Sequence, residues 1–279
     1  MRSGSGAPAT TACRAIGVGL LMGVTAGNVF AAAADLHFSR PIVLLGEVHD
    51  NAAQHALRLH AFRAWLVQGA RPALLMESFD RQRQPEIDRA VAAISGPASA
   101  ADAEVVIDAG APDRIGWNWA FYKPYVELAL RYQLPIVAAN VSRDEARSVI
   151  SDGLAAHGFD ADVPPSIQAA QTAAVEASHC GLIGAATAGK MAAAQIARDQ
   201  FMARMVQAHQ DRGVLLLAGN GHLRNDIGVP HWLSPAVRAR TESIGVLEAG
   251  DDSAAAYDRA VFTAAQQRPD PCEAMSKPR

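Results

Sequence analysis

Two carboxylates and two imidazoles follow apolar segments of this sequence within a few residues, and together they could bind a metal ion or transfer protons. Glu47, His49, Glu77 and His222 each come within a few residues of the end of a short apolar run. Carboxylate and imidazole groups bind zinc, iron or manganese, and a Glu paired with a His can also transfer protons. The sequence therefore predicts a divalent metal site or an acid-base catalytic site at these four residues. No HExxH, GxSxG, P-loop or GxGxxG signature accompanies them.

The apolar runs are typical of strands buried on both faces of a parallel sheet. They lie at residues 42–45, 73–76, 136–139 and 214–218. Asn140 closes the third run, and Asn220 follows the fourth just before His222. Because ligands bind beyond the carboxyl ends of such strands, we expect the polar side chains at all four ends to converge. Taken singly, each has a structural alternative, such as a turn, a helix N-terminal charge or a cap.

Helical patterns between these runs predict an α/β fold with a central, mainly parallel sheet flanked by helices. Helical spacing is found at residues 52–68, from 121 onward, at 166–178 and at 190–210, and further strands are expected at 243–247 and 257–263. Residues 81–118 are more than a strand-to-helix connection needs. We expect them to form a small helical cap over the site, within one domain that spans residues 35–279.

His55 shares a helical face with Leu59, Phe62 and Leu66, and that face should pack on the sheet. In the first turn of its helix, the imidazole would lie beside the strand ends, within reach of Glu47. The alternative is a structural histidine at the edge of the core.

Aromatic residues crowd into the segment 117–132. They are Trp117, Trp119, Phe121, Tyr122, Tyr125 and Tyr132. Such density is typical of a core, but it also suits the wall of a pocket for a flat apolar ligand, with a phenol free to bind metal or donate a hydrogen bond. Both interpretations stay open on the sequence alone.

Composition limits the partners. The chain has 279 residues, of which 50% are hydrophobic and 19% charged, and its net charge is −3. This length can bury a sizeable core in one large domain or two small ones. A slightly acidic chain without a lysine-rich run lacks the electrostatic footprint of a protein that binds nucleic acid or an anionic membrane surface.

The beginning of the chain has the pattern of a targeting segment. Arg2 and Arg14 precede the apolar stretch 15–26, and small residues follow at 31–34. This stretch is too short to span a bilayer but suits a signal peptide, which we place at residues 1–34. Cys13 precedes the apolar stretch and is therefore poorly placed for lipidation. We expect a periplasmic or secreted protein without a lipid anchor.

Two cysteines remain after the predicted cleavage, Cys180 and Cys272. An oxidising compartment favours a disulfide between them. The alternative is a thiolate metal site, although neither cysteine has a second one nearby.

Several segments resemble the ChaN-like family of haem-binding uptake proteins. They are LLGEVHDNAAQH, LLMESF, WNWAFYKPYVELA, LPIVAAN, HCG, AQIARDQFMARM and LLLAGNGHLRNDIGVP, and the match runs from about residue 41 to residue 272. The resemblance implies an α/β domain with a helical cap, bacterial export and a role in haem or iron acquisition. It also implies a homodimer and the components of a haem-uptake receptor or transporter as partners. The family's wider group includes Tiki metalloproteases and is similar in fold to erythromycin esterases.

The resemblance also assigns roles to particular residues. Glu47, His49, Glu77 and His222 match the polar centre that the family shares with its enzymatic relatives. In the family's better-known form haem is held through tyrosine, an accepted axial ligand of ferric haem, and the candidates here are Tyr122 and Tyr125. Further cofactor-binding candidates are His55, Asn140 and Asn220. The function implied is an exported haem-binding protein, and the alternative is a metal-dependent hydrolase of the peptidase or esterase type.

Overall fold

The computed structural model describes residues 36–270 and 272–273, which belong to one compact unit. The predicted signal peptide, residues 1–34, lies outside the described residues, and so does Cys13. Within the described part of the chain, no helix is both long enough and apolar enough to cross a membrane.

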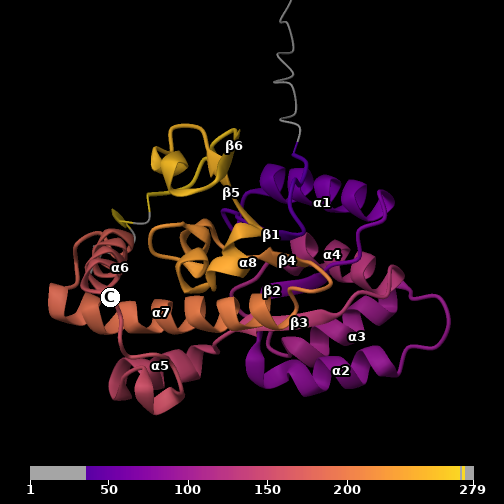
Figure 1. Cartoon of the computed structure of the whole chain (residues 1–279), viewed down its shortest axis with the longest axis horizontal. Coiled ribbons are helices and arrows are strands. Elements are labelled where there is room, and N and C mark those ends of the chain that lie inside the picture. Colours follow the sequence, from indigo (N-terminus) through magenta and orange to yellow (C-terminus); the bar gives the residue numbers. More distant parts are fainter. Residues whose placement is uncertain (1–35, 271, 274–279) are drawn as a thin grey trace, which may run out of the picture. The chain divides into compact units, whose positions relative to one another are not determined.

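A six-stranded sheet forms the centre of the fold (Figure 1). Its strands are β1 (Ile42–Leu45), β2 (Ala73–Asp80), β3 (Ile136–Asn140), β4 (Val214–Leu217), β5 (Thr241–Glu248) and β6 (Arg259–Thr263). They lie in the order β3-β2-β4-β1-β5-β6, and every neighbouring pair is parallel. From β1 the chain moves to β2 and β3 on one side, and it then returns through β4 to β5 and β6 on the other. Such a reversal opens a crevice at the carboxyl ends of the central strands.

The register of the central strands places their ends in one row. Leu45 of β1 pairs with Leu217 of β4 and with Ile244 of β5, and Leu217 also pairs with Met76 of β2. The residues that follow Leu45, Met76 and Leu217 are therefore neighbours in space. This register explains how polar residues from distant parts of the sequence meet at one edge of the sheet.

Helices surround the sheet, so the predicted α/β fold is confirmed. They are α1 (Ala52–Val67), α2 (Gln84–Ala92), α3 (Ala100–Gly110), α4 (Trp119–Arg131), α5 (Arg143–Asp152), α6 (Pro165–Ser178), α7 (Ala185–Ala208) and α8 (Pro235–Ala239). Helices α2 and α3, with the short 3-10 turn η1 (Arg81–Arg83), lie in the segment for which a helical insertion was predicted. That the insertion acts as a cap stays a prediction.

Apolar side chains are buried on both faces of the sheet, as the continuous apolar runs require. On one face, Val43 belongs to a cluster with Phe62 of α1 and Tyr125 of α4. On the other, Leu44 packs in a cluster with Met202 of α7. Figure 1 shows α1 and α7 on opposite sides of the strands. Two packed layers of helices therefore hold the strand ends in a fixed arrangement.

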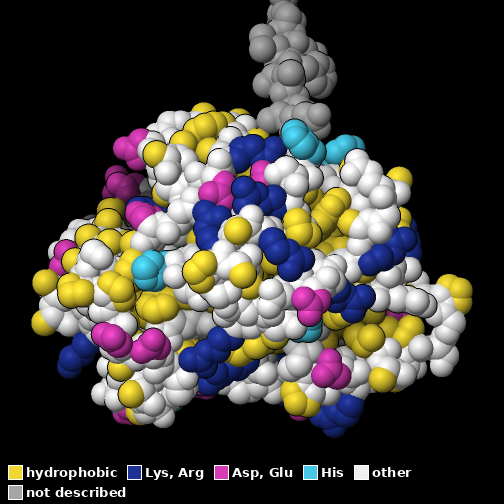
Figure 2. Space-filling view, in the orientation of Figure 1, with side chains coloured by type: hydrophobic (Ala, Val, Ile, Leu, Met, Phe, Trp, Pro, Cys, Tyr) yellow, Lys and Arg dark blue, Asp and Glu magenta, His cyan; other side chains and the backbone are white. Residues whose placement is uncertain are grey.

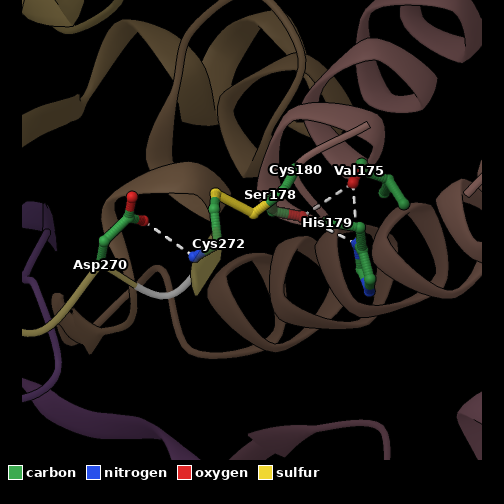
Figure 3. Close-up of a disulfide and its surroundings, with 6 residues drawn as sticks. All are labelled: Val175, Ser178, His179, Cys180, Asp270 and Cys272. Carbon is green, nitrogen blue, oxygen red and sulfur yellow. Dashed lines mark hydrogen bonds between the residues drawn. A yellow bond between two sulfur atoms is a disulfide. The ribbon is translucent and has the colours of Figure 1, made fainter. Parts of the chain in front are cut away.

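A disulfide ties the C-terminal tail to the α6–α7 connection (Figure 3). Cys180 and Cys272 are bonded with a Cα–Cα distance of 5.6 Å, which confirms the predicted bridge and excludes the thiolate alternative. Before reaching Cys272, the tail is held by Arg268, whose guanidinium pairs with Asp50 at 2.6 Å and with Glu248 at 2.7 Å.

The face shown in Figure 2 carries a mixed surface. Acidic, basic and hydrophobic side chains are interspersed over the described residues on that face. This mixture agrees with the small net charge of the whole chain.

Candidate functional site

Glu47 is the buried centre of the first group of site residues. It follows β1 and is only 2% exposed. Arg58 of α1, which is fully buried, forms an ion pair with Glu47 Oε2, and the Tyr122 hydroxyl donates to Oε1. His49 Nδ1 lies 2.7 Å from the same Oε1. Sequence reasoning missed Arg58, although its position three residues after His55 places it on the buried face of the helix.

His49 is the reactive group that this arrangement presents to solvent. Its side chain is 48% exposed, and the edge of the ring packs against Trp117 with the ring centroids 4.8 Å apart. A carboxylate at Nδ1 fixes the tautomer of an imidazole and leaves the lone pair on Nε2. Among the described residues, Nε2 of His49 has no hydrogen-bond partner. This nitrogen lies beside Gly219 and Glu77.

Gly219 lets Glu77 approach His49. Its backbone N–H donates to Glu77 Oε2 at 2.8 Å. A Cβ at this position would lie 2.9 Å from His49 Nε2 and 3.7 Å from Glu77 Oε2, so both side chains press against the bare Cα. The glycine after β4 is therefore required by a close approach of two site residues.

His222 lies between two carboxylates. Its Nδ1 is 2.6 Å from Asp199 Oδ1, and its Nε2 is 3.4 Å from Glu77 Oε1. Gln171 of α6 donates to the second oxygen of Asp199 at 3.0 Å. Sequence reasoning missed Asp199, although Ile196 and Met202 stand three residues before and after it on the buried side of α7.

These three groups shift one another's pKa values. Burial alone would lower the pKa of His222, but the charges of Glu77 and Asp199 raise it to about 10. Burial would likewise raise the pKa of Glu77, yet His222 and the Gly219 N–H lower it to about 2. Burial raises the pKa of Asp199 to about 6, against the opposing effect of His222. Near neutral pH the group is a buried imidazolium flanked by carboxylates.

Tyr122 and Tyr125 lie in the wall behind Glu47. Tyr122 is 2% exposed and Tyr125 fully buried, and the Tyr125 hydroxyl donates to the His55 carbonyl at 3.2 Å. Burial raises the pKa of Tyr125 to about 12 and also raises that of Tyr122, so both phenols keep their protons. Neither lines the cleft described below, and a role for either as an axial haem ligand stays a prediction.

The chain's other two tyrosines lie elsewhere. Tyr132 packs under the Arg71 guanidinium, and the buried Tyr257 donates to the carbonyl of Asn220 at 3.1 Å.

Of the remaining predicted residues, two hold backbone segments of the site in place and one lines the cleft described below. His55 is 3% exposed, its Nε2 donates to the His49 carbonyl at 3.0 Å, and its ring stacks on Phe121. Burial lowers the pKa of His55, so it is a neutral support for the His49 loop. Asn220 exchanges two hydrogen bonds with the backbone of Val246 in β5. Only Asn140 lines the cleft, with its Oδ1 buried and unpartnered in the described part of the protein.

The predicted divalent metal site is not supported. No group of three or more His, Cys, Asp or Glu side chains within residues 36–270 and 272–273 is arranged to hold a metal ion. The reason lies in the contacts of the carboxylates: Arg58 and Tyr122 take the oxygens of Glu47, and Gly219 and His222 take those of Glu77.

A cleft of about 480 Å³ opens beside these residues. Its lining includes His49, Glu77, Trp117, Asn140, Arg143 and Arg198. Ile115, which is 59% exposed, also stands at the cleft and adds apolar surface next to Trp117. His222 borders a separate cavity of about 190 Å³ against α6. The cleft is therefore the part of the site that can accept a ligand of moderate size.

A solved structure shares the fold. ChaN of Campylobacter jejuni, solved with cofacially bound haem, superposes with a TM-score of 0.61 at 21% identity, over 79% of this chain and 86% of that one. An erythromycin esterase mutant in its open conformation gives a TM-score of 0.41 at 14% identity, over 76% of this chain and 71% of that one. A comparison with curated proteins gives no match. The family described as haem-binding uptake, Tiki superfamily, ChaN matches residues 36–233, and the chain therefore belongs to that family.

Proposed function

We propose that this protein binds haem as part of haem or iron acquisition outside the cytoplasm, with the haem iron at His49 Nε2. The family supports haem as the ligand. The observation that carries the proposal is an exposed imidazole at a cleft, oriented by a buried carboxylate that is itself fixed by Arg58 and Tyr122. A histidine held in this way is a common axial ligand of haem iron. Residues 1–34 would direct export in this proposal.

The cleft has the volume of a pocket for a small ligand. Its volume of about 480 Å³ is within the usual range for pockets that hold small ligands. Trp117, placed edge-on to His49, offers an apolar wall beside the iron position, and Ile115 extends it. Other lining residues, such as Asp80 and Arg198, are polar. A porphyrin bound here would leave much of its apolar surface uncovered by this chain.

This mostly polar lining supports a dimer in the same proposal. An exposed porphyrin face is an apolar surface, and covering it with a second haem or a second copy of the chain removes that surface from water. The solved ChaN structure is described as binding haem cofacially. A receptor or transporter for haem would be the partner that delivers or accepts the ligand.

Titration of the purified protein with haemin, followed by the Soret absorbance, tests the proposal. We expect saturable binding by the wild type and a weakening of about tenfold or more in His49→Ala, because loss of an axial ligand removes upward of about 1.4 kcal/mol. His60→Ala is the matched control, since His60 is exposed and lines none of the cavities found among the described residues. Sedimentation of the titrated sample measures whether the complex holds two copies.

The same variants separate a second candidate function. The Glu47–His49 pair, with Nε2 free beside Glu77, has the geometry of a general base for hydrolysis. If the wild type does not bind haemin saturably, haem binding is wrong. If the wild type in that case cleaves nitrophenyl esters faster than His49→Ala does, in the presence of a chelator that removes metal ions, hydrolysis replaces haem binding as the function. Equal haemin affinity in wild type and His49→Ala would leave haem binding standing but remove His49 as the ligand.

A further inference from the structure

An arginine precedes each of three adjacent strands, at the end of the sheet opposite the cleft. Each arginine stands two positions before the first residue of its strand: Arg40 and Ile42 in β1, Arg71 and Ala73 in β2, and Arg212 and Val214 in β4. The first residues of β1 and β2 both pair with the first residue of β4. Because neighbouring strands lie about 4.8 Å apart, the three arginines stand in one row at the amino ends of the strands.

A cavity of about 270 Å³ opens at this row, and all three arginines line it. Among the described residues, no acidic side chain belongs to its lining. Phe38 and Trp65 form part of its wall, and their rings meet edge to face with the centroids 5.1 Å apart. The other lining residues are Ser39, Pro41, Ala70, Pro72 and Gly213. The cavity therefore combines positive charge with an apolar wall.

The three guanidinium groups are held by backbone carbonyls and not by carboxylates. Arg40 donates to the Thr241 carbonyl at 3.2 Å, and Arg71 to the Leu66 carbonyl at 2.9 Å. Arg212 Nε makes only a long hydrogen bond, of 3.4 Å, to the carbonyl of Arg71. Carbonyls orient these side chains but carry no formal charge to cancel theirs. All three arginines are exposed, and within the described part of the chain the two Nη groups of Arg212 have no acceptor.

Acidic side chains near this end of the sheet do not neutralise the row. Glu242 accepts hydrogen bonds from the backbone N–H and the hydroxyl of Ser39, at 3.0 and 2.9 Å, and pairs with Arg259 at 3.2 Å. Asp211 precedes Arg212 in the sequence, but it is exposed and does not line the cavity. One such acid set against three arginines leaves a net positive charge. Repulsion among like charges around one cavity favours an anionic ligand.

We propose that this cavity binds a phosphate monoester whose other part is apolar, with the phosphate at the arginine row and the apolar part against Phe38 and Trp65. A guanidinium offers parallel N–H donors that match phosphate oxygens. A dianion with three terminal oxygens uses three arginines better than a singly charged carboxylate does. Aromatic side chains offer a large apolar surface to the rest of the ligand. The site is independent of the proposed haem binding, because it lies at the other end of the strands.

Calorimetric titration with phenyl phosphate at low ionic strength tests the site. We expect saturable binding by the wild type and a weakening of about tenfold or more in Arg212→Gln, because the variant loses charged donors to the phosphate. Its melting temperature should not change, since Arg212 is exposed and makes one long hydrogen bond. Arg204→Gln is the matched control. Arg204 is exposed, donates to the Gly158 carbonyl at 2.7 Å and lines no cavity found in the described residues.

Two further ligands test the two halves of the proposal. Inorganic phosphate has the charge without the apolar part, and benzoate has the ring with a single charge. We expect both to bind more weakly than phenyl phosphate. Inorganic phosphate binding as tightly as phenyl phosphate would show that the aromatic wall takes no part. Benzoate binding as tightly would show that the row does not select phosphate. Either result would overturn the proposal as stated.

A phosphate monoester can come from a soluble compound or from the headgroup of phosphatidic acid, so sedimentation with vesicles that contain this lipid is measured in parallel. Binding of phenyl phosphate supports a soluble ester. Binding to vesicles alone supports the lipid headgroup, provided that Arg212→Gln abolishes it and Arg204→Gln does not. The site is wrong if neither probe binds, or if both variants lose binding equally. Haemin titration of Arg212→Gln should match the wild type, so failure of this site and failure of haem binding are separate results.

Discussion

At the scale of single residues, His222 explains how two carboxylates can be buried side by side near the cleft. Glu77 and Asp199 contact the two nitrogens of one imidazole. Two buried anions without a counter-charge would be costly, and a cation between them offsets that cost. His222 therefore has a clear structural task, and the catalytic role that its position after a strand suggested stays a prediction.

The stability of the protein should reflect this imidazolium. The pKa of His222 is raised to about 10, so the folded state holds a proton that the unfolded chain loses near its ordinary value of 6.5. The stabilisation is therefore complete below about pH 6.5 and is lost as the pH rises toward 10. Glu77, whose pKa is lowered to about 2, contributes stability above its ordinary value of 4.5 and loses it as the pH falls through 2.

We expect His222→Asn to reduce the free energy of unfolding by about 3 to 5 kcal/mol near neutral pH, because it leaves two buried carboxylates without their cation. Urea denaturation between about pH 7 and pH 10 measures the second consequence: stability should fall more steeply in the wild type than in the variant, which has no imidazolium to lose. The exposed His60→Asn is the control. Parallel slopes for wild type and His222→Asn would contradict a raised pKa at this site.

The sequence could identify the acids and imidazoles of the site but not their supports. Glu47, His49, Glu77 and His222 stand near strand ends, where the α/β fold concentrates ligands. Arg58 and Asp199 lie within helices, where a charged residue is usually solvated, and only helical spacing relates them to buried neighbours. The directions of Tyr122 and Tyr125 depend on packing between α1 and α4, which spacing does not provide.

At the scale of elements, the turn after β4 positions the site. The 3-10 turn η3 (Asn220–Leu223) is fixed to β5 by the two hydrogen bonds of Asn220 with Val246. Gly46 makes room for them, because a Cβ there would lie 2.0 Å from Asn220 Oδ1. The turn thereby holds Gly219 against His49 and Glu77.

Two glycines of this segment give a matched pair of variants. A methyl group at Gly219 would meet His49 Nε2 at 2.9 Å, whereas one at Gly221 would have nothing within 4 Å. We expect Gly219→Ala to displace the imidazole and weaken haemin binding by about tenfold or more, since a shift of about 1 Å at a site can cost that much. Gly221→Ala should keep the wild-type affinity. Equal titration curves for the two variants would show that this contact does not control His49.

Element positions were largely predictable, and the exceptions have physical causes. The apolar runs at 42–45, 73–76 and 214–218 are strands, as periodicity indicated. Strand β2 continues beyond its apolar run to Asp80, because it pairs again with Asn140 after a register shift. Glu77 therefore lies within a strand and not after one. Pairing of this kind depends on the neighbouring strand and leaves no local signal in the sequence.

At the scale of the whole molecule, the fold class followed from the sequence but the strand order did not. Strand β4 lies between β1 and β2, which are consecutive along the chain. This placement brings Gly219 and His222 to Glu77, and it is set by long-range contacts that periodicity cannot encode. The parallel-sheet pattern supplied the expectation that the polar strand ends converge, but it could not say which strands would be neighbours.

The disulfide closes a long loop of the chain. Cys180 and Cys272 are 92 residues apart, and the segment between them contains α7, β4, η3, β5 and β6. A cross-link of this length is expected to stabilise a folded chain by about 4 to 5 kcal/mol through the entropy of the unfolded state. Most of the elements that position Gly219 and His222 therefore depend on one covalent bond for part of their stability.

Replacing both cysteines tests this dependence without leaving a free thiol. We expect Cys180→Ser with Cys272→Ser to lower the free energy of unfolding by about 4 to 5 kcal/mol in urea, and to match the wild type measured in reductant. Haemin affinity should change little where the variant is folded, because the bond lies outside the cleft lining. An unchanged free energy of unfolding would contradict this expectation. It would mean that the conformations of the unfolded chain are already restricted without the disulfide. The ion pairs of Arg268 with Asp50 and Glu248 would then be what holds the folded tail in place.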